Sequence, residues 1–253
     1  MRNILKPKVL LPTCLIVLFA GFTAAVAQTA PQAALPSVDQ VLDKYVKAVG
    51  GQAAIEKLTS RVSKGTFEMD QMPGPAAEEI DAKAPNKQYM VTDIPNYGQV
   101  KRGFNGAAGW EDNPQTGLRD ITGSELATMK RDADFYGAVN FKEHYPKMTV
   151  KAKESVNGHD AYVIEATPPD GAADTMYFDA DSGLLVRMQR EAEGPNGKVT
   201  VDITFDDYRE VDGIKIPYAM HFSMGDFAFT IKFNEVKHNV PIDDAKFEKP
   251  ALH

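Results

Sequence analysis

The sequence of 253 residues contains a single cysteine, Cys14, which lies in an apolar stretch near the N-terminus. The rest of the chain therefore has no disulfide framework, no thiol nucleophile and no cysteine-ligated metal. A domain of this length does not need disulfides, because folding buries about 70–75% of the surface of its unfolded chain. The scarcity of cysteine thus excludes a group of functions without excluding a stable fold.

Sequence motifs for nucleotide, serine-hydrolase and zinc chemistry are also missing. The chain has no Gly-x-Ser-x-Gly elbow, no phosphate-binding loop and no pair of histidines at the i, i+4 spacing of a zinc helix. Residues 179–183 resemble the start of a calcium loop, but Gly183 is fifth and Leu184 sixth, where an EF-hand has an oxygen ligand and a glycine. We predict a tight turn there, and we expect no metal, no cofactor and no catalytic residue.

The chain also has fewer basic than acidic residues. The chain has 28 Lys and Arg against 35 Asp and Glu, a formal net charge of −7. Three of the basic residues, Arg2, Lys6 and Lys8, belong to an N-terminal segment without acidic residues, so the remainder is more acidic still. This balance argues against binding nucleic acid or an anionic lipid surface through a basic face. We expect no nucleic-acid partner.

Residues 1–27 predict a secretory signal peptide. Basic residues precede the apolar run Val9–Phe22, and Ala25-Val26-Ala27 has the small-x-small form of a cleavage site. The run is short for a membrane span, which needs about 20 residues, although an uncleaved N-terminal anchor is the alternative. Leu11-Pro12-Thr13 is a poor lipobox, so Cys14 does not predict a lipoprotein. We expect cleavage after Ala27 and a periplasmic or secreted protein.

The remaining chain predicts one domain after a short spacer. Residues 28–36 are rich in Ala, Pro and Gln, as is typical of a flexible segment. No second linker or shift in composition follows. We therefore expect a signal peptide over 1–27, a spacer over 28–36 and a single domain over 37–253.

Alternation of apolar and polar residues dominates that domain. Between Lys198 and Tyr208, four apolar residues face one way and four polar residues face the other, which predicts a strand with one buried face. Similar runs are joined by Asn-Gly, Asp-Gly and Ser-Gly turns, typical of hairpins. A change of parity near Gly65 predicts a β-bulge. About ten or eleven antiparallel strands result, and a sheet this wide curls or closes.

Two or three short helices accompany the strands. Ser37 and Gln40 form a capping box ahead of an amphipathic stretch that Gly50-Gly51 ends. Residues 52–58 add a shorter turn. Thr122 and Glu125 form a second capping box before a helix that ends near Asp134, and residues 135–144 fit either a helix or an irregular segment.

Three successive strands near the C-terminus give one continuous apolar wall. The helices offer few large side chains to cover it, so a curved sheet would retain space for a chain-like apolar ligand. A fully packed core is the alternative. The wall residues that we expect to contact a ligand are Val201, Ile203, Phe205, Met220, Phe222, Phe229 and Ile231, and we place Trp110 and Met129 near the rim or lid.

Four segments together resemble a known group of secreted proteins. They are Val38–Tyr45 with the following Gly50-Gly51, Tyr177–Leu185, Asp207–Pro217 and Asn239–Phe247. These turn and strand-end patterns are similar to those of the LolA/LolB-like superfamily of outer-membrane lipoprotein-sorting proteins. The resemblance implies an α+β fold, a curved antiparallel half-barrel of about eleven strands, with helices that lid the concave face. It also implies no cofactor and no chemical step.

The function expected from wall and resemblance is the binding of a lipid, the acyl chains of a lipoprotein or another long apolar ligand. Expected partners are a lipid or acylated protein and an envelope membrane protein. One alternative is a non-catalytic envelope scaffold with a packed core that acts through protein contacts. A second is a hydrolase that uses the same cavity.

Overall fold

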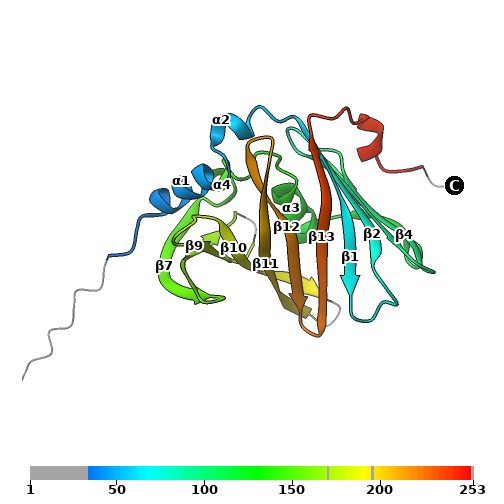
Figure 1. The fold of residues 1–253 in the computed structure, drawn as a ribbon. Coiled ribbons are helices and arrows are strands. Elements are labelled where there is room, and N and C mark those ends of the chain that lie inside the picture. The colour runs from blue at the N-terminus through cyan, green and yellow to red at the C-terminus, as the bar shows by residue number, and fades with distance from the viewer. Residues whose placement is uncertain (1–33, 170, 195–196, 252–253) are drawn as a thin grey trace, which may run out of the picture. The chain divides into compact units, whose positions relative to one another are not determined.

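Residues with alternating polarity and tight turns assemble into a structure based on one large sheet (Figure 1). The computed structural model describes residues 34–169, 171–194 and 197–251. The expected signal peptide and residues 28–33 of the spacer lie outside the described residues. The helical elements are α1 (Val38–Ala48), α2 (Gln52–Ile55), α3 (Gly123–Asp132), α4 (Phe141–His144) and the 3-10 turn η1 (Asp244–Phe247).

Thirteen strands form the sheet. They are β1 (Ser60–Met69), β2 (Ala76–Lys83), β3 (Lys87–Ile94), β4 (Gly98–Phe104), β5 (Gly109–Asn113), β6 (Gly117–Ile121), β7 (Lys147–Val156), β8 (His159–Thr167), β9 (Asp174–Asp179), β10 (Leu185–Gly194), β11 (Gly197–Val211), β12 (Ile214–Met224) and β13 (Phe227–His238).

The strands follow the order β6-β5-β4-β3-β2-β1-β13-β12-β11-β10-β9-β8-β7. Every neighbouring pair is antiparallel, and β6 and β7 are the two free edges. The sheet is therefore open, as expected of a half-barrel. The expected count of about eleven strands was too low.

The strand that was not predicted from the sequence is β6. Its central side chain, Arg119, bonds to Glu111 on β5 at 3.1 Å between Nε and Oε1. An ion pair therefore occupies positions where an ordinary strand would present apolar residues to the core. Without alternation, the pattern that reveals a strand is absent.

The predicted alternation along β11 and β12 is confirmed. Val201 and Ile203 are buried, and Thr204 on the other face is not. On β12, Ile214, Ile216 and Tyr218 are buried, whereas His221 is exposed on the polar face, as predicted. One face of these strands thus contributes to two apolar clusters, which α1 and α2 help to cover.

The first helix begins as the sequence predicts. Ser37 and Gln40 form a complete capping box, with distances of 3.2 Å from the Gln40 amide to Ser37 Oγ and 2.8 Å from the Ser37 amide to Gln40 Oε1. The second predicted box is wrong. Thr122 is the N-cap of α3 but makes no side-chain capping bond, and the Glu125 carboxylate bonds to arginines on the sheet instead.

Helix α3 crosses the sheet and reveals its curvature. Near its start, Glu125 Oε1 accepts a hydrogen bond from Arg102 Nη2 on β4 at 2.6 Å. At its end, Asp132 accepts from Arg190 Nη1 on β10 at 2.9 Å. Seven residues of helix span ~10 Å, whereas the seven interstrand steps from β4 to β10 would cover ~34 Å on a flat sheet. The sheet therefore curls around α3, and we call the face that α3 crosses the concave face. In Figure 1, α3 lies behind β11–β13.

The C-terminal segment covers part of the opposite face, which we call the outer face. Lys246 of η1 bonds to Glu79 on β2 at 2.7 Å and also contacts Asp81. Lys249 bonds to Asp120 on β6 at 2.7 Å. Phe247 is fully buried among these strands. The segment thus ties the first half of the sheet together from outside.

Gly65 explains how β1 joins β13. The register of the pair shifts between Lys64 and Gly65, at the predicted place, but the extra residue is Asn234 of β13 and β1 keeps an unbroken register with β2. A Cβ atom on Gly65 would lie 1.9 Å from the carbonyl oxygen of Lys232, because the backbones approach closely there. Only glycine fits this position without moving the backbone.

We predict that Gly65→Ala lowers the free energy of unfolding by at least ~2 kcal/mol, because the added methyl group collides with backbone. Gly74→Ala is the matched control, since a Cβ there meets no atom within 4 Å, and it should change stability by less than about 0.5 kcal/mol. Urea denaturation of both variants provides the measurement. Equal, small effects would contradict the close approach at Gly65.

Candidate functional site

The apolar wall forms on the concave face from three neighbouring strands. Val201, Ile203 and Ile231 are buried, with exposed fractions of 9%, 7% and 6%. Phe205, Met220, Phe222 and Phe229 are only half-buried. The cross-strand pairs Phe205–Met220 and Phe222–Phe229 place these four side chains next to one another. The structure therefore brings seven of the nine predicted residues together, and the middle of the wall is its least covered part.

An aromatic row extends the wall onto the next strand. The rings of Phe222 and Phe229 stack with centroids 4.5 Å apart, and Phe67 of β1 stacks on Phe229 at 5.0 Å. Phe67 was not among the predicted wall residues, although its strand was. The row gives the wall a flat apolar surface three strands wide.

The connection from β6 to β7 covers the wall loosely. This connection contains α3, a turn over residues 134–139 and α4. A helix that crosses a core normally buries a stripe of side chains, yet α3 and α4 bury no residue within their bounds, and only Ala133 and Tyr145, directly after them, are buried in this part of the connection. Phe135, Tyr136 and Val139 pack against the wall cluster but stay half-buried. The cover is thus in place without sealing the wall.

A further space opens beside α1. It measures about 210 Å³ and is lined by Val41 and Lys44 of α1 and by Tyr162 and Phe178 of the sheet. Val41 and Phe178 also belong to the apolar cluster that includes Val201 and Ile203. Room between helix and sheet therefore exists at this margin of the wall as well.

The other half of the concave face is charged. Arg102 and Arg119 share the carboxylate of Glu125 from α3, and both also approach Glu111 within 3.5 Å. These bonds raise the pKa of Arg119 and, through Arg119, lower that of Glu125. Two cations and two anions balance one another. The concave face is therefore amphipathic, with apolar side chains on β11–β13 and paired charges on β4–β6.

Glu78 is the exception to this pairing. It projects to the concave face of β2, since Ile80 on the same face joins the wall cluster and Glu79 on the opposite face bonds to Lys246. Its exposed fraction is 3%, and neither carboxylate oxygen has a hydrogen-bond partner among the described residues. Burial raises the pKa of Glu78 to about 7; nearby Thr92 opposes the rise, although its hydroxyl lacks hydrogen-bond geometry.

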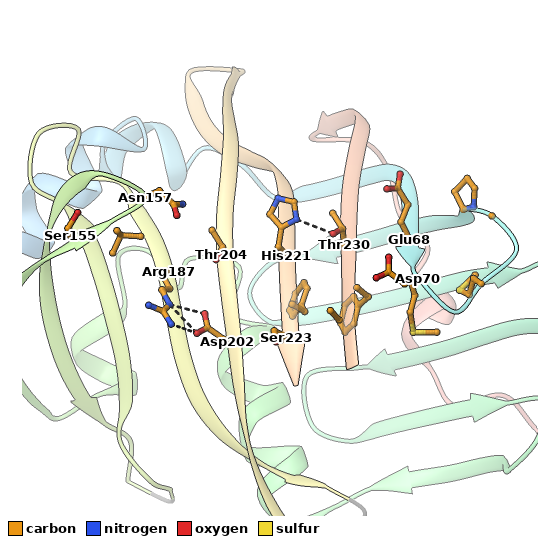
Figure 2. A pocket seen from close by; sticks show the side chains of 18 residues that line it. Glu68, Asp70, Ser155, Asn157, Arg187, Asp202, Thr204, His221, Ser223 and Thr230 are labelled. Carbon is orange, nitrogen blue, oxygen red and sulfur yellow. Dashed lines mark hydrogen bonds and ion pairs between the residues drawn. The ribbon is translucent and has the colours of Figure 1, made fainter. Parts of the chain in front are cut away.

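A groove of about 800 Å³ lies on the outer face of the same strands (Figure 2). It runs across β10–β13 and β1, between the β7–β8 turn at Ser155 and Asn157 and the β1–β2 loop at Asp70. Within it, Arg187 Nε donates to Asp202 at 2.9 Å, and His221 Nδ1 lies 3.0 Å from Thr230 Oγ1.

The chemistry of this groove is that of a polar contact surface. Its arginine is already engaged by Asp202, so an incoming anion finds no free guanidinium. His221 has a hydroxyl neighbour, but among the described residues no carboxylate is hydrogen-bonded to it, so a nucleophile–base–acid series is incomplete. The part of the chain that the structure describes contains no cluster of three or more potential metal ligands.

Comparisons with known proteins bear on the fold. No protein-family model matches the chain, and no curated protein does. Among solved structures, a DUF1329 family protein from Desulfovibrio piger is similar with a TM-score of 0.58 and 17% identity, over 83% of this chain and 97% of that one.

Two further structures have names related to lipoprotein sorting. A putative outer membrane lipoprotein-sorting protein domain from Vibrio parahaemolyticus has a TM-score of 0.58 at 12% identity, over 83% of this chain and 97% of its own. A LolA superfamily protein from Nitrosomonas europaea has a TM-score of 0.56 at 13% identity, over 85% and 99%. The chain has a LolA-like fold. At these identities the likeness establishes the fold alone.

The last two predicted residues lie elsewhere in the LolA-like sheet. Trp110 projects from the outer face of β5, where its Nε1 donates to the carbonyl of Phe247 at 2.9 Å under η1. Four strands separate β5 from β13, so Trp110 does not border the wall. Met129 lies on α3, as expected of a lid residue, and its sulfur packs near Gly109 on β5.

Sequence reasoning missed the polar members of this LolA-like concave face. Glu78 begins a predicted strand, but it is followed directly by Glu79 and so resembles a surface residue. Only the pairing of β2 with β1 and β3 shows which way it projects.

No helix of the described residues has the length and hydropathy of a membrane span.

We predict that Glu78→Gln stabilises the LolA-like domain in a pH-dependent way. Between the ordinary pKa of 4.5 and the raised value of about 7, the folded state keeps a proton that the unfolded state has lost, so stability falls as pH rises. In Glu78→Gln the side chain cannot ionise, so this loss of stability at higher pH does not occur. Wild type and variant should be similar near pH 4.5, and the variant should gain roughly 2–3 kcal/mol above pH 7.

Glu79→Gln is the matched control on the other face. Burial alone would raise the pKa of Glu79, but bonds from Lys246 and Lys64 lower it overall. That carboxylate adds stability above its unfolded pKa, so its removal should lower stability at neutral pH. Urea titrations at several pH values measure both effects. A Glu78→Gln effect that is independent of pH would contradict a buried, unpaired carboxyl group.

Proposed function

We propose that the protein is an exported, non-catalytic carrier that binds a lipid, an acylated protein or another ligand with a long apolar chain on the concave face. The ligand chain lies along the wall, between the sheet and the connection that contains α3. Export depends on the N-terminal signal peptide that the sequence predicts, and the periplasm or the cell exterior is the expected location.

The observation that carries this proposal is the loosely covered wall. Four adjacent apolar side chains at its centre are half-buried, and the helix that crosses the concave face buries no residue. A sheet face this apolar gains free energy when it is covered completely. The LolA-like fold supports the proposal because it supplies an open, curved sheet, without specifying what is bound.

Binding requires only a shift of the covering segment. An incoming chain displaces the contacts of residues 135–139 with the wall cluster and takes their place. Each buried CH₂ group contributes about 0.8 kcal/mol, so one or two acyl chains supply enough free energy for tight binding. Nothing in this process needs a covalent step.

The groove on the outer face favours a second candidate, a scaffold that acts through protein contacts. Its wide, polar, charge-paired surface is suited to a protein partner such as an envelope membrane protein. The polar side chains of the groove lie on the face opposite the wall, while Phe222 and Phe229 of the wall also line the groove. A scaffold function alone, however, does not explain why the wall is only half-covered.

Lipid content after export tests the carrier. The full-length chain is expressed with its own leader in a Gram-negative host, purified without detergent, and examined by native mass spectrometry and lipid extraction. Wild type should carry lipid at near one equivalent. An unliganded mass, with thermal unfolding that does not respond to added fatty acid, would favour the scaffold.

We predict that Phe205→Glu abolishes this lipid loading, because it places a charge at the centre of the wall, where burial of an ion is costly. Thr204→Glu is the matched control, since it adds the same side chain at the next position on the outer face. It should load like wild type. Retention of lipid by a folded Phe205→Glu variant would reject the wall as the binding surface.

A further inference from the structure

Glu78 combines deep burial with the lack of any partner. Its exposed fraction is 3%, and both of its carboxylate oxygens are buried without a hydrogen bond to a described residue. An unpaired carboxyl group at such a position lowers stability, and a well-packed apolar side chain would serve a purely structural role better. The position therefore calls for a reason other than folding.

The remaining charges of the concave face show how such groups are normally satisfied. Arg102 and Arg119 bond to Glu111 and Glu125 in a balanced set. Arg61, also on this face of β1, is half-buried and has no ion-pair partner among the described residues, and burial lowers its pKa. Glu78 has no such partner among the described residues. It is thus the acidic group on this face that a ligand would satisfy most.

The surroundings of Glu78 connect it to the wall. Its cross-strand neighbour on β1 is Gly65. Two residues further along β1, on the same face, Phe67 begins the aromatic row that continues through Phe229 and Phe222. An acid therefore stands at one end of a flat apolar surface. This is the arrangement of a site for a molecule with a polar head and an apolar tail.

We propose that Glu78 receives the ammonium head of an amphiphile whose apolar chain lies along the row of Phe67, Phe229 and Phe222. This inference rests on the proposed carrier function and names the chemical class of its ligand. When it is ionised, Glu78 only accepts hydrogen bonds and so selects a donor, and an ammonium group supplies three donors and the opposite charge. The adjacent phenylalanine faces favour a cation as well. An anionic head would be repelled.

Three probes with the same chain separate head from tail. Dodecylamine, dodecanol and dodecanoic acid, each below its micelle concentration, are titrated into the full-length protein freed of lipid. We expect the amine to bind roughly tenfold or more tightly than the alcohol, because it forms charged hydrogen bonds, and the acid to bind least. In Glu78→Gln the advantage of the amine should disappear while the affinity for the alcohol changes less than about twofold.

Glu79→Gln controls for the acidity of the whole protein. It removes the same charge from the neighbouring residue on the outer face, so it should leave the preference for the amine intact. An equal loss of the amine preference in both variants would show that the preference comes from the overall negative charge of the protein. That result would overturn the assignment. Equal binding of all three probes, unaffected by Glu78→Gln, would overturn it while leaving the carrier function standing. Failure of all three to bind would overturn both.

Discussion

Two arginine–carboxylate contacts hold the structure in its working form. One joins Glu125 at the start of α3 to Arg102 and Arg119, and the other joins Asp132 at its end to Arg190. The seven helical residues between these contacts span ~10 Å, whereas β4 and β10 would lie ~34 Å apart in a flat sheet. These contacts hold α3 across the concave face of the curled sheet.

The attachment of α3 through charged side chains affects how much of the core it covers. Because α3 is attached through its charged side chains, it does not need to bury an apolar stripe, and it buries no residue. Ion pairs with the sheet thus hold α3, while residues 135–139 add apolar contacts with the wall cluster. A ligand can then compete for the wall without first replacing all of the interactions that hold the helix.

Local sequence signals predicted the framework well. Alternation along β11 and β12 and the capping box at Ser37 each depend on a few neighbouring residues, and each is found in the structure. Features that depend on distant pairing were missed. The strand β6 lacks apolar alternation because Arg119 pairs with Glu111.

The same limit applies to the candidate site. The seven wall residues lie on strands with clear alternation, so their common face could be predicted. Trp110 could not be assigned a face, because that depends on the C-terminal segment that returns to cover it. Glu78 resembles an ordinary surface residue until strand pairing shows that it projects inward. Polar residues on a concave face are thus the part of a LolA-like site that sequence patterns reveal least.

Hydrogen–deuterium exchange of α3 tests the loosely held cover most directly. The amides of residues 123–139 in the lipid-free protein are compared with those of β12, before and after addition of a long-chain fatty alcohol. The account predicts weak protection of the covering segment that rises strongly with the ligand, while β12 is protected throughout. A covering segment as protected as β12 without ligand, and unchanged by it, would contradict the account.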